Sequence, residues 1–94
     1  MPVNFLVHHE GDDVGVAVED IAAGTQSAGR YKDQAGEVDI LVSEDVPLGH
    51  KLALHDIADG AEIIEYGVAI GRATADIRTG QYVHTHNLKG QRWY

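Results

Sequence analysis

The sequence predicts a mainly β domain built from short strands, with helix confined to one-turn segments. Apolar and polar residues alternate in several short stretches, and a period of two residues is the pattern of a strand with one buried face. The chain has 11 glycines in 94 residues, above the usual share of about 7%, which favours many tight turns. No window of about 11 residues combines helical periodicity with capping residues. The best helical candidate, 19–23, is a single turn.

Chain length limits the domain organisation. A chain of 94 residues forms one domain with a modest core, which we expect to span residues 1–94. No apolar run approaches the roughly 18–20 residues that cross a bilayer, and the first residues lack the basic and apolar regions of a signal peptide. We therefore expect a cytoplasmic protein without a membrane segment.

Charge and the absence of cysteine exclude further classes. Fifteen acidic residues against seven Lys and Arg give a formal net charge of −8, which opposes nucleic-acid binding because such binding depends on cations that neutralise phosphates. Without cysteine, disulfides and thiolate metal sites are excluded, so any metal must be held by His, Asp or Glu. Residues 84–94 contain Lys89 and Arg92 but no acid, and an anionic ligand or partner is favoured there.

The predicted strands follow one another with turns between them. One alternating stretch covers 14–18, a second strand covers 36–44, and a third lies at 52–54, ahead of a hairpin at 66–72. The segment 24–36 is polar and rich in Gly, Ser, Gln and Asp, which indicates an exposed loop or hairpin. The alternating apolar residues are Val14, Val16 and Val18, then Val38, Ile40 and Val42, then Leu52 and Leu54.

A short unit, Asp-Ile followed by Gly three residues after the Ile, occurs three times. In each copy we expect the Asp to bond backbone amides just ahead in a tight turn, the Ile to fill the core, and the Gly to take a positive φ. A turn explains these residues fully, so the unit is scaffold rather than chemistry. The copies are Asp20-Ile21 with Gly24, Asp56-Ile57 with Gly60, and Asp76-Ile77 with Gly80.

His84 and His86 form the first candidate site. On an extended segment, residues two apart point the same way, so both imidazoles face one side. Neutral imidazoles suit Fe, Zn, Mn or Ni, but a metal site needs three or more ligands, and at least one is then unaccounted for. The pair therefore has three interpretations: metal ligands, groups that contact substrate or move a proton, or two exposed histidines.

His50 and Lys51 form the second candidate, at the end of a turn made by Pro47 and Gly49. A Lys and a His exposed by a tight turn can hold a carboxylate, and the His can move a proton near neutral pH. The alternative is a β-turn followed by two solvated side chains.

Three further segments are weaker candidates. The stretch 8–13 is dense in His and carboxylates but lacks the spacing of a calcium loop, so we expect an acidic turn in which only the role of His9 stays open. Arg72, in the predicted hairpin, either binds an anion or is solvated, and His55 is expected at the surface. Trp93, beside Arg92, is either an interface anchor or packs on its own domain.

Four motifs in series make the chain similar to a known family. The resemblance is to the SAF domain of the altronate and galactarate dehydratase family and covers about residues 5–93. It implies a β-clip fold, that is, a compact SAF-like domain. The motifs are His9-Glu10-Gly11-Asp12-Asp13-Val14, Gly49-His50-Lys51, Tyr66-Gly67 with Ile70-Gly71, and His84-Thr85-His86-Asn87.

The same resemblance implies a function in β-elimination on a small anionic 2-hydroxy acid. A free-standing SAF chain resembles the small subunits of two-chain sulfo-lyases, which implies a heteromer with a large catalytic subunit and no activity alone. The expected reaction is (2R)-sulfolactate to pyruvate and sulfite; the alternatives are a split altronate-type dehydratase and a non-catalytic binding module. Family members typically depend on Fe(II), so Fe(II) or another divalent metal is expected in the assembled complex.

We expect the site residues to converge on one exposed surface, with His9 at its edge. The ground is that the turn at Gly49 and the His84/His86 segment both adjoin strands, where functional side chains collect. Catalytic roles are expected for His50, His84 and His86, and substrate contacts for His9, Lys51, Asn87 and Arg72.

Overall fold

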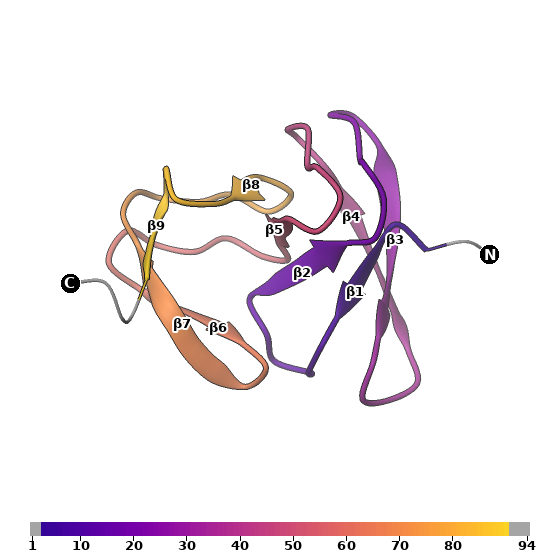
Figure 1. Ribbon diagram of the computed structural model, residues 1–94, viewed down its shortest axis with the longest axis horizontal. Coiled ribbons are helices and arrows are strands. Elements are labelled where there is room, and N and C mark those ends of the chain that lie inside the picture. The colour runs from indigo at the N-terminus through magenta and orange to yellow at the C-terminus, as the bar shows by residue number, and fades with distance from the viewer. Residues whose placement is uncertain (1–2, 91–94) are drawn as a thin grey trace.

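The computed structural model describes residues 3–90 and consists of strands and turns in two sheets (Figure 1). The larger sheet has the order β4-β3-β1-β2-β5-β8 and the smaller one β6-β7-β9. In this part of the chain there is no helix, and hence none that could span a membrane. The mainly β prediction is confirmed, but the one-turn helices are absent from residues 3–90, because each Asp-Ile unit forms a turn and a single bridge. The strands are β1 (Phe5–Val7), β2 (Val14–Ala17), β3 (Gln26–Tyr31), β4 (Glu37–Leu41), β5 (Lys51–Ala53), β6 (Glu62–Glu65), β7 (Val68–Ala73), β8 (Tyr82–Val83) and β9 (Leu88–Gly90).

Strand β3 decides between the loop and the hairpin expected at 24–36 in favour of the hairpin. It pairs parallel with β1 and antiparallel with β4, so the polar segment is one arm of a hairpin. Ser27 is fully buried, and its hydroxyl is satisfied there because it donates to the Ile40 carbonyl oxygen at 2.7 Å. Gly29 is buried because the Phe5 ring occupies the space that a side chain would need. Polar and small residues therefore face the core here without losing their hydrogen bonds.

Two apolar clusters form the core. One lies between the strands of the larger sheet and includes Phe5, Ile21 and Leu52. The other joins the two sheets and includes Ile57 and Ile77. The three Ile residues of the Asp-Ile units are 1–5% exposed, so their predicted burial is confirmed.

The Asp-Ile units work in pairs, which the sequence did not predict. Ile57 bridges Ile77, and Ile21 bridges Val46, so Asp45-Val46 with Gly49 is a fourth copy with Val in place of Ile. Each Asp accepts a backbone N–H from its partner unit rather than from its own turn. The bonds are Leu48 N–H to Asp20 and Ala23 N–H to Asp45, both 2.8 Å, with Asp59 N–H to Asp76 at 2.9 Å and Thr79 N–H to Asp56 at 2.8 Å.

The β6–β7 hairpin turns at Tyr66 and Gly67, so a hairpin is present at the predicted 66–72, although Gly71 and Arg72 lie within β7. Both residues have positive φ, 58° and 73°, which is the backbone of a two-residue hairpin turn. The Asp12 carboxylate accepts the N–H groups of Tyr66 and Gly67 at 2.9 and 3.0 Å, and Asp13 accepts that of Ile64 at 2.7 Å. The acidic turn at 8–13 therefore fastens the smaller sheet to the larger one.

Candidate functional site

Four rings gather where the chain enters β5 and leaves β8; we call them the ring cluster: His50, Tyr82, His84 and His86. The ring centroids of His50 and His84 are 4.9 Å apart. Tyr82 stacks on His84 at 5.5 Å with an interplanar angle of 8°, and lies 5.6 Å from both His50 and His86. His50 and Tyr82 are half-buried, while His84 and His86 are exposed. The three predicted catalytic histidines therefore share one surface.

Strand register explains how distant residues meet in the ring cluster. Tyr82 is directly opposite Leu52 in the β5–β8 pair, so both side chains lie on the same face of the sheet. The turn before β5 is fixed by Gly49, whose φ is 84° and whose N–H donates to the Ala17 carbonyl oxygen at 2.8 Å. The Tyr82 hydroxyl and His50 Nδ1 are 2.6 Å apart. Tyr82 is the member that the sequence analysis missed, although its position two residues before His84 places it on the same face.

Asn87 is buried and closes the turn that carries the two exposed histidines. Its side-chain oxygen accepts the His84 N–H, and its amide NH₂ donates to the Tyr82 carbonyl oxygen, both at 2.9 Å. The amide thus has backbone partners on both sides. Contact between Asn87 and a substrate hydroxyl stays a prediction.

Lys51 is the first residue of β5, and its side chain extends toward β6 of the smaller sheet. Its Nζ is 3.9 Å from Oε1 of Glu65, which is only 6% exposed. Burial raises the pKa of the Glu65 carboxyl, and Lys51 and His8 nearby partly offset that effect. The structure therefore does not join Lys51 to the ring cluster.

His8 completes the surroundings of Glu65. Its Nε2 is 3.6 Å from Oε2 of Glu65, and its ring stacks on Tyr66 with centroids 3.9 Å apart and an interplanar angle of 11°. Its Nδ1 is buried without a hydrogen-bond partner. This second group of charged side chains lies between the two sheets.

The remaining predicted contact residues lie elsewhere. His9 is in the turn before Val14, whereas His50 accepts a hydrogen bond from Ala17 at the far end of β2, so His9 is not at the edge of the ring cluster. The His9 Nδ1 atom is 2.8 Å from Oδ2 of Asp33. Arg72 is exposed and donates to the Gly60 carbonyl oxygen at 2.9 Å. Trp93 lies outside the described residues.

The chain's own side chains do not complete a metal site within residues 3–90. No three His, Asp or Glu side chains there are arranged to hold an ion. In the ring cluster, the His50 Nδ1 atom contacts the hydroxyl of Tyr82. The described residues therefore do not fit a metal held by this chain alone.

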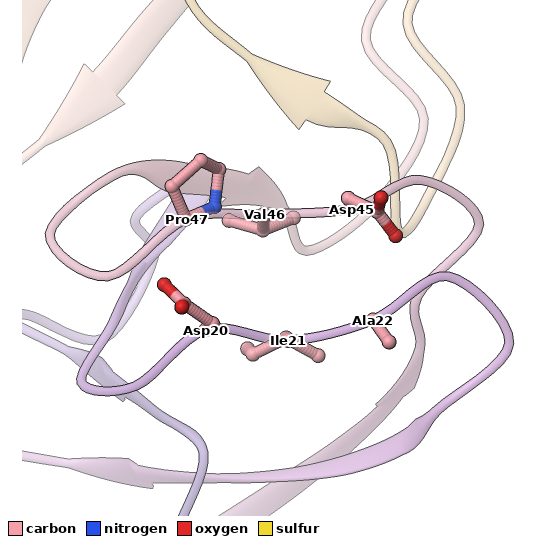
Figure 2. Close-up of a pocket in the computed structure, with 6 residues that line it drawn as sticks. All are labelled: Asp20, Ile21, Ala22, Asp45, Val46 and Pro47. Carbon is pink, nitrogen blue, oxygen red and sulfur yellow. The ribbon is translucent and has the colours of Figure 1, made fainter.

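A pocket of about 380 Å³ lies beside the first pair of units and is lined by Asp20, Ile21, Ala22, Asp45, Val46 and Pro47 (Figure 2). Both carboxylates already accept backbone N–H groups. A similar pocket of about 320 Å³ recurs beside the second pair, around Asp56 and Asp76. The repetition indicates a consequence of the paired turns rather than a site for chemistry.

Comparison with known proteins identifies the family of this chain. The model of the altronate/galactarate dehydratase SAF domain matches residues 3–91. The (2R)-sulfolactate sulfo-lyase subunit alpha of Chromohalobacter salexigens is 43% identical over 94 residues, covering 99% of this chain and 100% of the relative. Altronate dehydratase of Escherichia coli is 40% identical over 87 residues, 93% of this chain but only 16% of the relative. Galactarate dehydratase of the same organism is 36% identical over 83 residues, 14% of its length. The chain belongs to the altronate/galactarate dehydratase SAF-domain family.

Proposed function

We propose that the chain is the small subunit of a heteromeric lyase that eliminates sulfite from (2R)-sulfolactate to give pyruvate. One observation carries this proposal: the chain matches the whole length of a relative named as a sulfo-lyase alpha subunit. The altronate dehydratases, in contrast, are matched over only 16% of their length. A small chain that corresponds to a complete subunit favours a partner on a separate, larger chain.

The chemistry needs a proton removed from the carbon next to the carboxylate. The C–S bond then breaks, sulfite leaves with the bonding electrons, and the resulting enol takes a proton at its terminal carbon and loses its hydroxyl proton to become pyruvate. Imidazoles suit both proton transfers because their ordinary pKa of about 6.5 is near neutral. We assign this proton handling to the ring cluster, where His84 and His86 are exposed.

The proposed site is composite. Two of the three histidines in the ring cluster are exposed, whereas small-molecule sites bury most of their ligand. The larger subunit therefore supplies the rest of the site. The proposal includes Fe(II) or another divalent metal in the assembled complex, with ligands from the larger subunit.

The test is an activity assay of the two chains produced together, with (2R)-sulfolactate and altronate offered separately. We expect sulfite and pyruvate from sulfolactate, and no turnover by the small chain alone. Turnover of altronate in place of sulfolactate would establish the second candidate, a split sugar-acid dehydratase, which the 40% identity to altronate dehydratase favours. A chain that binds no large subunit would instead be a binding module.

A variant experiment separates the two roles open to the exposed histidines. If His84 and His86 move protons, replacing either by Ala leaves metal occupancy of the complex unchanged and lowers turnover by about 10²–10⁴-fold. If they are metal ligands, occupancy falls. The proposal expects the first result.

A further inference from the structure

Tyr82 holds a central place in the ring cluster. Its ring lies within 5.6 Å of the ring of each of the three histidines. Its backbone is fixed on both sides, because its N–H donates to Oε1 of Glu44 at 2.9 Å and its carbonyl oxygen accepts the Asn87 amide at 2.9 Å. The backbone that carries the phenol is thus fixed at the point where the hydroxyl contacts Nδ1 of His50.

The contact between Tyr82 and His50 has a preferred direction. The hydroxyl oxygen and Nδ1 are 2.6 Å apart, which is a hydrogen-bond distance. A phenol is a stronger donor than acceptor, whereas the unprotonated nitrogen of a neutral imidazole is a strong acceptor. The chemistry of the two groups therefore indicates that the hydroxyl donates and Nδ1 accepts.

We propose that Tyr82 is a positioning residue that fixes the ring and the tautomer of His50. Because Nδ1 accepts the phenol proton, the neutral imidazole carries its own proton on Nε2. His50 then serves as a hydrogen-bond donor to an anionic oxygen of the substrate, while the exposed His84 and His86 remain available for proton transfer. The tautomer rests on the contact between Tyr82 and His50 and the chemistry of its two groups, and the substrate oxygen rests on the proposed function.

The first experiment measures the tautomer in the full small chain. Long-range ¹H–¹⁵N correlation spectra of the ¹⁵N-labelled protein distinguish protonated from unprotonated ring nitrogens, at a pH about two units above the ordinary imidazole pKa of about 6.5. We expect the His50 proton on Nε2 alone. A proton on Nδ1 in the wild-type chain would overturn the proposal without any variant.

The second experiment uses Tyr82→Phe, with Tyr66→Phe as the matched control. Tyr66 also stacks on a histidine, His8, but lies outside the ring cluster. We expect Tyr82→Phe to give a rise in the His50 form protonated at Nδ1, and Tyr66→Phe to give none. An unchanged His50 tautomer in a folded Tyr82→Phe chain would contradict the assigned role.

Kinetics of the assembled pair connect the tautomer to turnover. We expect Tyr82→Phe to lower kcat by about 10- to 100-fold, as misplacement of a functional group does, with little change in KM. A kcat equal to that of the Tyr66→Phe pair would refute a positioning role. If the wild-type pair is inactive on every 2-hydroxy acid but the tautomer is as expected, the proposed function fails while the assignment of Tyr82 to His50 stands.

Discussion

Gly24 and Gly80 occupy the same position in two Asp-Ile units, so Gly24→Ala and Gly80→Ala form a matched pair of variants. Only at Gly80 would the added methyl group meet a neighbouring part of the chain. The two glycines have nearly equal φ, 85° and 88°, so an Ala side chain carries the same left-handed cost at both, about 1–2 kcal/mol. At Gly24 a Cβ would meet nothing within 4 Å, whereas at Gly80 it would meet the backbone carbonyl oxygen of Leu41. Forced contacts in a packed structure cost a further 1–3 kcal/mol or so.

We therefore expect Gly24→Ala to lower the free energy of unfolding by about 1–2 kcal/mol and Gly80→Ala by about 2–5 kcal/mol. Urea unfolding followed by far-UV circular dichroism measures both free energies. If the dependence of the free energy on urea concentration is the same in the two variants, they expose the same surface on unfolding and the comparison is valid. The contact matters for the site because the Ser43 N–H donates to the Gly80 carbonyl oxygen at 3.0 Å, just ahead of Tyr82. If both variants lose the same free energy of unfolding, Gly80 does not lie as close to the Leu41 backbone as the structure shows.

Three further predictions concern the core, the buried carboxyl and the turn of the site. Ile77→Ala removes a side chain that is 1% exposed and should cost about 2–5 kcal/mol in urea unfolding; a cost below about 1 kcal/mol would mean that the paired bridges are misplaced. Because burial raises the folded pKa of Glu65 above 4.5, its contribution to stability is present at low pH and lost as the pH rises through the folded pKa. As the pH rises through the folded pKa of Glu65, the wild-type protein should thus lose free energy of unfolding relative to Glu65→Gln. A difference in free energy of unfolding that does not change with pH would contradict this. Asn87→Ala should lower stability by about 1–3 kcal/mol because buried backbone groups lose their partners; wild-type thermal unfolding and an unchanged His84 amide shift would show that Asn87 does not close the turn.

Sequence reasoning predicted the features that depend on local patterns. The alternation at 38, 40 and 42 marked a strand in which Ile40 is buried, and the hairpin expected at 66–72 is present with its turn at Tyr66 and Gly67. Positive φ at Gly24, Gly60 and Gly80 followed from the absence of a side chain. These features are fixed by a few neighbouring residues, so a single sequence contains the information.

Features that depend on pairing across the chain were not predictable in the same way. The Asp of each unit accepts an N–H from a residue 17 to 28 positions away, such as Asp20 from Leu48, and the local alternative, a bond within its own turn, has the same sequence signature. The segment of β3 lacks apolar alternation because Ser27 and Gly29 fill its buried positions. Neither a serine nor a glycine indicates by its type that it will meet the Ile40 carbonyl oxygen or the Phe5 ring.

The candidate site shows the same division. The proximity of His50 and His84 was predicted from the turns that precede and follow strands, and the centroids are 4.9 Å apart. The separation of Lys51 from the ring cluster was not predicted, because it depends on the position of Glu65, toward which the Lys51 ammonium points. Tyr82 joins the cluster through the register of β5 with β8, which no local motif encodes.

The measurement that tests the central claim most directly is the turnover of a reconstituted pair in which His84 is replaced by Ala. His84 is exposed and its ring is not needed for the core, so the variant chain should fold and assemble with the large subunit in wild-type proportion, as size-exclusion chromatography would show. The account predicts that this assembled pair turns over (2R)-sulfolactate about 10²–10⁴-fold more slowly than wild type. A fully assembled pair that works at the wild-type rate would contradict the claim that the ring cluster is this chain's part of the active site.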